Sequence, residues 1–197
     1  MADKYQNKYR IPSARLQNWD YGWNASYFVT ICTQNRECYF GDILDGKMQL
    51  TEIGNLAKKY WQEIPQHFPF VQLDAFVVMP NHVHGIILID KPQNGGNGCN
   101  VNVVETRHCL VSTTPNNDEP KTIGQKRFQN QGKNTLSSII GSYKSVVTKN
   151  ARKIHAGFAW QSRFHDHIIR NNESFEKIKS YIIENPLKWN DDKFYIT

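Results

Sequence analysis

The segment from residue 74 to residue 90, DAFVVMPNHVHGIILID, constrains the fold more than any other part of the chain. It contains two runs rich in β-branched and aromatic residues, and Pro80 and Asn81 separate them. Such runs are typical of strands, and a Pro-Asn pair between them marks a tight connection. The segment therefore predicts two neighbouring strands joined by a short turn.

Hydrophobic periodicity predicts further elements on both sides of this strand pair. Runs of β-branched and aromatic residues indicate strands, and apolar residues at helical spacing indicate helices. These patterns predict a strand at 26–36, a helix at 51–68, a helix at 135–153, a strand within 158–170 and a helix at 171–186. Strands mixed with helices in this order predict an α+β fold, a ferredoxin-like antiparallel sheet with helices packed on one face.

The composition changes between about residue 91 and residue 133. Gly, Asn, Gln, Pro and Thr dominate this stretch, and no period persists in it. A loop of this length is unusual inside a compact domain. We therefore predict a single domain over residues 1–197 that carries a flexible polar insertion at about 91–133. The insertion is either a passive variable loop or an arm that contacts nucleic acid.

The charge balance favours an acidic partner. The 197-residue chain carries a formal net charge of +6. A basic balance of this size favours nucleic acid first and a membrane surface second, although a merely soluble basic protein is the simpler alternative. No apolar run reaches the roughly 18 residues of a membrane span. The polar N-terminus lacks the apolar centre of a secretory signal, so we expect a cytoplasmic protein with no membrane partner.

Two histidines interrupt the second strand of the pair. Side chains alternate between the faces of a strand, so His82 and His84 point the same way and Val83 points the other way. Two imidazoles placed like this can converge on one cation, but they supply only two ligands. A pair of structural histidines with hydrogen-bond partners is the alternative. A second His-x-His, at residues 165–167, has charged neighbours and is more typical of a polar edge strand.

Helical geometry distinguishes two tyrosines that follow the insertion. At about 100° per residue, Tyr143 falls in the middle of the apolar stripe of its helix and is most simply a core residue. Tyr181 falls at the edge of the stripe of its own helix, and Asn185 lies one turn later on the same side. A phenol and an amide oxygen together suit cleavage of a phosphodiester by tyrosine beside a metal ion. A tyrosine that only packs the helix boundary is the alternative.

Three segments in this order, MPNHVHGIIL, WQSRFHDHIIR and SYIIENPLKW, resemble the REP-associated tyrosine transposases. These are relatives of the insertion-sequence single-strand transposases, which have an HUH motif (His, hydrophobic, His) and one catalytic tyrosine. The resemblance covers roughly residues 10–90 and 134–192. It implies a ferredoxin-like or RRM-like α/β domain that uses Mg²⁺ or Mn²⁺. Its implied substrate is single-stranded DNA that bears a REP-like hairpin.

The resemblance also implies roles for individual residues. His82 and His84 match the metal-binding histidines, and Tyr181 matches the nucleophile, which would leave a 5′-phosphotyrosine and a free 3′-hydroxyl. Asn185 matches the helix position of the third metal ligand, where related transposases have glutamine. One matching segment has no assigned role beyond shaping the site; it contributes Trp160, Gln161, Phe164, Asp166, His167 and Arg170.

Basic residues on the helix at 135–153 would then contact the phosphates of the DNA. This predicted nucleic-acid-binding face consists of Lys144, Lys149, Arg152 and Lys153. A solvated charged face without a partner is the alternative for each of them. For the whole chain, the alternative to a transposase is a non-catalytic protein that binds single-stranded nucleic acid and retains the fold. We expect a monomer or a homodimer.

Overall fold

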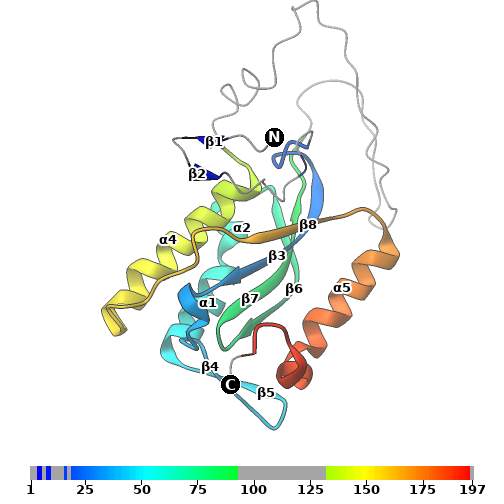
Figure 1. The fold of residues 1–197 in the computed structure, drawn as a ribbon. Helices are drawn as coiled ribbons and strands as arrows, with labels where there is room; N and C mark the ends of the chain where they lie inside the picture. Colours follow the sequence, from blue (N-terminus) through cyan, green and yellow to red (C-terminus); the bar gives the residue numbers. More distant parts are fainter. Residues whose placement is uncertain (1–3, 6–7, 10–15, 17–18, 93–131, 196–197) are drawn as a thin grey trace, which may run out of the picture.

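The computed structural model of the chain describes residues 4–5, 8–9, 16, 19–92 and 132–195 (Figure 1). Nearly all of the predicted insertion at 91–133 lies outside the described residues, so its role stays a prediction.

A four-stranded antiparallel sheet forms the centre of the molecule (Figure 1). The strands lie in the order β6-β7-β3-β8, with bounds β6 Val71–Met79, β7 His82–Ile89, β3 Ala25–Cys32 and β8 His165–Ile169. Met79 pairs with His82, so Pro80 and Asn81 alone connect β6 to β7. The tight connection predicted at Pro80 and Asn81 is therefore confirmed.

Besides the 3-10 segment that follows the last helix, three pieces of this architecture were not predicted from the sequence. Two are two-stranded pairs, β1 Lys4–Tyr5 with β2 Lys8–Tyr9 and β4 Gly41–Leu44 with β5 Lys47–Leu50. The third is the 3-10 turn η1, Gln34–Arg36, which follows β3.

The helices follow the predicted pattern with shorter bounds. They are α1 Glu52–Gln62, α2 Ile64–His67, α4 Leu136–Ile154 and α5 Asn172–Glu184, and the 3-10 segment η2, Asn185–Asp191, follows α5 directly. The predicted helix at 51–68 is thus divided in two near Pro65, because proline removes a backbone donor. Among the described residues, no helix combines the length and the apolar character needed to cross a membrane.

The larger hydrophobic core lies between α1, α4 and one face of the sheet. Alternate strand residues reach this face, among them Val83 and Ile87 of β7, together with Val29 of β3. Trp61 of α1 is fully buried there, and its ring packs edge-on against Tyr143 of α4 at a centroid distance of 5.3 Å. Tyr143 is therefore the core residue that its helical phase predicted.

The opposite face of the sheet is covered by α5. A smaller cluster joins Ile86 of β7 and Ile169 of β8 to Ile182 of α5. The α+β antiparallel fold class is confirmed, but helices cover both faces of the sheet instead of one. The reason is that Ile86 and Leu88, which alternate with Val83 and Ile87 along β7, are also apolar, so this part of the second face needs a cover as well.

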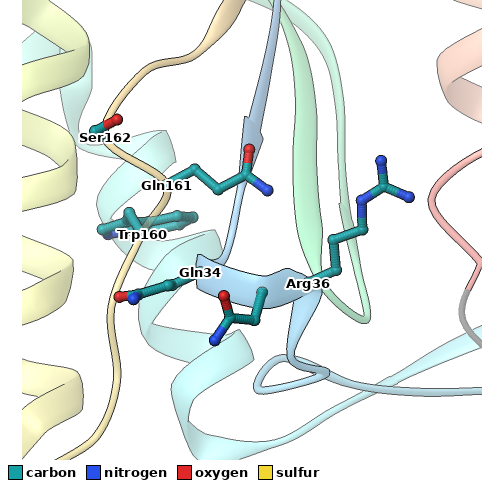
Figure 2. Close-up of a pocket in the computed structure, with 6 residues that line it drawn as sticks. Gln34, Arg36, Trp160, Gln161 and Ser162 are labelled. Carbon is teal, nitrogen blue, oxygen red and sulfur yellow. The ribbon is translucent and has the colours of Figure 1, made fainter. Parts of the chain in front are cut away.

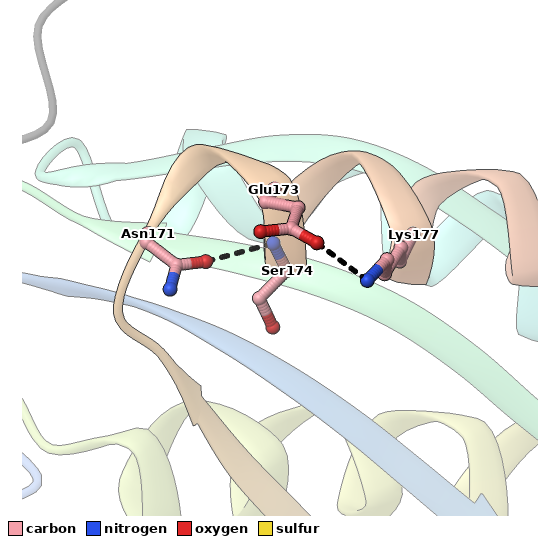
Figure 3. Close-up of polar contacts among 4 residues, drawn as sticks. All are labelled: Asn171, Glu173, Ser174 and Lys177. Atoms are coloured by element: carbon pink, nitrogen blue, oxygen red, sulfur yellow. Dashed lines mark hydrogen bonds and ion pairs between the residues drawn. The ribbon is translucent and has the colours of Figure 1, made fainter.

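The start of α5 is fixed by a side-chain cap. The Asn171 side chain accepts a hydrogen bond from the backbone N–H of Ser174 at 2.8 Å (Figure 3). Glu173, in the first turn, forms an ion pair with Lys177 at 2.6 Å. Both of these side chains are exposed, so the cap contributes more to the helix start than the ion pair does.

A glycine in β7 allows the close contact between the sheet and α1. A Cβ atom at Gly85 would overlap the indole of Trp61, whereas a Cβ at Gly141, on the exposed side of α4, meets nothing within 4 Å.

We expect Gly85→Ala to lower the free energy of unfolding by about 1–3 kcal/mol through overpacking. Gly141→Ala is the matched control, and it should raise stability by up to about 1 kcal/mol through helix propensity. Urea denaturation of both variants measures the difference. Equal effects of the two changes would contradict the proposed close packing at Gly85.

Candidate active site

The two histidines of β7 lie side by side under α5 and the C-terminal segment. His82 and His84 are 0% and 1% exposed, and their ring centroids are 4.4 Å apart. They point away from the core of α1 and α4, as the alternation of the strand predicted. Phe194 also packs against this pair, with its ring centroid 4.6 Å from that of His82.

One nitrogen of each imidazole is occupied by a neighbouring side chain. His82 Nδ1 lies 2.8 Å from the Oδ1 atom of Asn81, and His84 Nδ1 lies 2.8 Å from the Thr30 hydroxyl. The Asn81 amide is itself oriented, because its Nδ2 donates to the backbone carbonyl of Phe194. Since Asn81 Oδ1 can only accept, His82 Nδ1 carries the proton and its Nε2 atom presents a lone pair. His82 Nε2 has no hydrogen-bond partner among the described residues.

The environment keeps both imidazoles neutral. Burial, assisted by the charges of Lys193 and Arg36, lowers the pKa of His82 to about 3. Burial, assisted by the neighbouring His82, holds the pKa of His84 well below its usual value. Neutral imidazole is the form that binds metal ions.

Tyr181 and Asn185 reach the same place from the end of α5 and the start of η2. The Tyr181 hydroxyl lies 3.3 Å from His84 Nε2, and it donates to Asp192 Oδ2 at 3.3 Å. Asn185 is buried, and its Nδ2 donates to the same carboxylate oxygen at 3.0 Å. The structure thus brings together the two histidines, the tyrosine and the asparagine that were selected from the sequence.

The phenol of Tyr181 is not ionised by its surroundings alone. Burial raises its pKa to about 12, and the negative charge of Asp192 adds to the shift. The side chain is nevertheless 40% exposed. A phosphate in solution can therefore approach the hydroxyl, but the phenol must lose its proton before it can attack.

Asp192 was missed by the sequence analysis. The ligand atoms of His82, His84 and Asp192 all lie within 4.8 Å of one another. The carboxylate reaches them because η2 turns the chain back toward β7, and the backbone carbonyl of Lys193 accepts a hydrogen bond from Arg36. No periodic pattern in this short tail could have identified the residue.

The donor set fits a divalent cation. Besides His82 Nε2, the buried Oδ1 atom of Asn185 has no hydrogen-bond partner in the described part of the chain. Two unpartnered buried polar atoms at one place, with a carboxylate beside them, are costly unless another group satisfies them. Imidazole nitrogens combined with amide and carboxylate oxygens suit a divalent ion, but they do not select one.

The predicted nucleic-acid-binding residues lie elsewhere. Lys144, Lys149, Arg152 and Lys153 belong to α4, which packs on the face of the sheet opposite to the histidines. Lys144 is half-buried and donates to the carbonyl of Gln161, and Arg152 donates to that of Phe158. The structure does not bring this basic face to the histidines, and its binding of DNA stays a prediction.

The second His-x-His lies on β8, the edge strand of the sheet. His165 and His167 are both exposed, in agreement with the polar edge predicted for them. His165 pairs with Thr30, whose hydroxyl contacts His84, so this edge adjoins the histidine pair.

Two relatives come from Haemophilus influenzae. One, named "Uncharacterized protein", is 38% identical over 185 residues, which cover 93% of this chain and 92% of the relative. The other, named "Putative REP-associated tyrosine transposase", is 25% identical over 169 residues, which cover 86% of this chain and 74% of the relative. No protein-family model matches the chain.

A solved structure has a similar fold. It is a REP-associated tyrosine transposase bound to a REP hairpin, and it superposes with a TM-score of 0.55 at 19% identity. The match covers 93% of this chain and 77% of the other. At this identity the likeness concerns the fold.

Acid should destabilise the protein through its buried histidines. Because the pKa of His82 is about 3 in the folded protein and near 6.5 in the unfolded chain, protonation favours unfolding. Stability should be complete above about pH 6.5 and fall toward pH 3, by up to about 1.4 kcal/mol per pH unit for each such histidine.

Urea unfolding between pH 7 and pH 4, with EDTA present, measures this dependence. His82→Gln should reduce the slope, and His67→Gln, at an exposed histidine of α2, should leave it unchanged. The explanation fails if His82→Gln retains the slope of the unaltered protein.

Proposed function

Since this chain belongs to the same family as the REP-associated tyrosine transposases, we propose that it is a metal-dependent DNA strand transferase. It nicks single-stranded, hairpin-bearing DNA and rejoins it through a 5′-phosphotyrosine intermediate. The observation that carries the proposal is the pair of unpartnered buried atoms, His82 Nε2 and Asn185 Oδ1, next to a half-exposed tyrosine. A purely structural histidine pair would leave this arrangement unexplained.

His82, His84 and Asn185 would hold the cation, Mg²⁺ or Mn²⁺. In this assignment Asp192 orients the amide, because it accepts from Nδ2 and leaves Oδ1 without a hydrogen-bond partner. Asn81 and Thr30 orient the imidazoles in the same way through the Nδ1 atoms. When bound, a divalent cation polarises a non-bridging phosphate oxygen and stabilises negative charge on the leaving oxygen.

Tyr181 is the nucleophile. Its hydroxyl donates to Asp192 Oδ2, which gives the phenolic proton an acceptor. The phenolate oxygen then attacks phosphorus, an O–P bond forms, and the bond to the 3′ oxygen breaks with its electron pair. The 3′ oxygen takes up a proton and becomes a free hydroxyl. The phosphotyrosine retains the bond energy, so a second 3′-hydroxyl can reverse the step and rejoin a strand.

The net charge of the chain and its similarity to a DNA-binding transposase both support DNA as the substrate. The chain carries a net charge of +6, and the solved structure with this fold holds a REP hairpin. The basic residues of α4 lie across the sheet from Tyr181. Two of them, Lys144 and Arg152, bond to the carbonyls of Gln161 and Phe158 in the segment that leads into β8. We propose that this face contacts phosphates of the bound DNA.

Two tyrosines provide a matched test of the nucleophile. Incubation with a labelled hairpin-bearing oligonucleotide and Mg²⁺ or Mn²⁺ should give a covalent adduct that withstands denaturing electrophoresis. Tyr181→Phe should abolish the adduct. Tyr143→Phe should retain it, because that hydroxyl is buried in the core and donates to the carbonyl of Ala57.

Loss of the adduct in the Tyr143 variant alone would overturn the assignment of the nucleophile. The non-catalytic alternative makes a different prediction. It would hold if the unaltered protein bound the oligonucleotide with a strong salt dependence but formed no adduct with either metal.

Mutations can distinguish the role of Asn185, the proposed third metal ligand, from that of Asp192, the proposed proton acceptor. Asn185→Ala should weaken Mn²⁺ binding, measured by calorimetry, by at least about 10-fold. Asp192→Asn should retain more of that affinity, while it slows adduct formation because the phenolic proton loses its carboxylate acceptor. Asp191→Asn changes the exposed neighbouring carboxylate and should behave like the unaltered protein. If Asp192→Asn lost as much affinity as Asn185→Ala, Asp192 would be a ligand.

A further inference from the structure

A cleft open to solvent lies between η1 and the segment that leads into β8 (Figure 2), at the end of the sheet where Cys32 pairs with His82. Its volume is about 690 Å³. The lining residues are Gln34, Asn35, Arg36, Trp160, Gln161 and Ser162. Trp160 and Gln161 belong to the sequence segment that had no assigned role, so the cleft offers a function for them.

The lining suits a nucleobase. The amides of Gln34, Asn35 and Gln161 each offer both a donor and an acceptor, and the edges of bases present the same groups. No hydrogen bond within the described residues occupies these three side-chain amides. Trp160 is half-buried, and aromatic side chains stack on unpaired bases. The lining includes no carboxylate that would repel a phosphate.

The backbone holds the two walls of the cleft together. The N–H of Gln34 donates to the carbonyl of Ala159 at 2.8 Å, and the N–H of Gln161 donates to that of Cys32 at 2.9 Å. The indole N–H of Trp160 donates to the carbonyl of Lys144 at 3.2 Å. Because these bonds use backbone groups and the indole N–H, the walls are fixed and the three amides stay free for a ligand.

Arg36 connects the cleft with the histidine pair. It lines the cleft, and its guanidinium carbon lies 5.3 Å from the centroid of the Phe194 ring. That ring packs on His82. The sheet register also places η1 near His82, because Cys32, two residues before Gln34, pairs with His82. A nucleotide in the cleft would therefore have a cation next to its phosphate, on the side toward the histidines.

We propose that this cleft binds one unpaired base of the DNA strand next to the scissile phosphate, and that its amides select which base is accepted. This inference rests on the proposed function for the identity of the ligand. Hydrogen bonds from Gln34 and Gln161 set the preference, stacking on Trp160 adds affinity, and Arg36 contacts the phosphate.

The test is a binding selection without strand cleavage. Tyr181→Phe protein is equilibrated with a pool of hairpin-bearing DNA whose unpaired flanking positions are randomised, and the bound fraction is sequenced. One flanking position should show a preference of roughly 5- to 100-fold for one base. Adding Gln34→Ala and Gln161→Ala should remove that preference. Adding Gln66→Ala, at an exposed glutamine of α2 outside the cleft, should keep it.

Two outcomes would overturn the inference: no preference at any flanking position, or a preference that survives the loss of both glutamines. A second measurement uses the unaltered side chains. When a photoreactive halogenated analogue of the preferred base replaces it, ultraviolet light should cross-link it to Trp160, and a cross-link that maps only outside the cleft would also overturn the inference.

The experiments distinguish an error in the proposed base site from an error in the proposed strand-transfer reaction. If the unaltered protein forms no covalent adduct but the selection still shows the glutamine-dependent preference, the strand-transfer reaction is wrong and the base site stands. If the adduct forms at Tyr181 and the preference ignores both glutamines, the reaction stands and the base site is wrong.

Discussion

Two hydrogen bonds to imidazole Nδ1 atoms determine what the rest of this site can do. Asn81 and Thr30 occupy the Nδ1 atoms of His82 and His84, and burial keeps both rings neutral. Only the Nε2 atoms are left to face α5 and the C-terminal segment. If the His82 ring were reversed, or if either ring were protonated, the site would present an N–H instead of a lone pair and could not bind a cation.

The two faces of the sheet have different contents: one carries the large hydrophobic core, and the other carries the histidine pair. The face toward α1 and α4 carries the large core, where Gly85 lets Trp61 pack directly on β7. The other face has a smaller apolar cluster around Ile86 and Ile182, and the two histidines lie beside it under Phe194. A thin apolar layer on this side leaves Tyr181 partly open to solvent while the histidines beside it stay buried.

Local periodicity predicted the parts of the site that depend on one element at a time. Strand alternation placed His82 and His84 on one face, and helical phase placed Tyr181 and Asn185 together. The same reasoning could not predict Asp192, because its position depends on the turn η2 and on tertiary hydrogen bonds to the tail. Nor does an amphipathic helix specify which sheet face it covers, so neither the side taken by α5 nor the distance of the basic α4 residues from Tyr181 followed from the sequence.

The site also lies at one end of the sheet rather than across its middle. His82 is the first residue of β7, and it pairs with Cys32, the last residue of β3. The connections that leave this end carry Asn81 on one side and Gln34 to Arg36 on the other. Asn81, which orients His82, and the residues that line the cleft therefore belong to different loops of one sheet. Under the proposed function, changes in η1 would alter which base is accepted while the hydrogen bonds that hold the histidines stay intact.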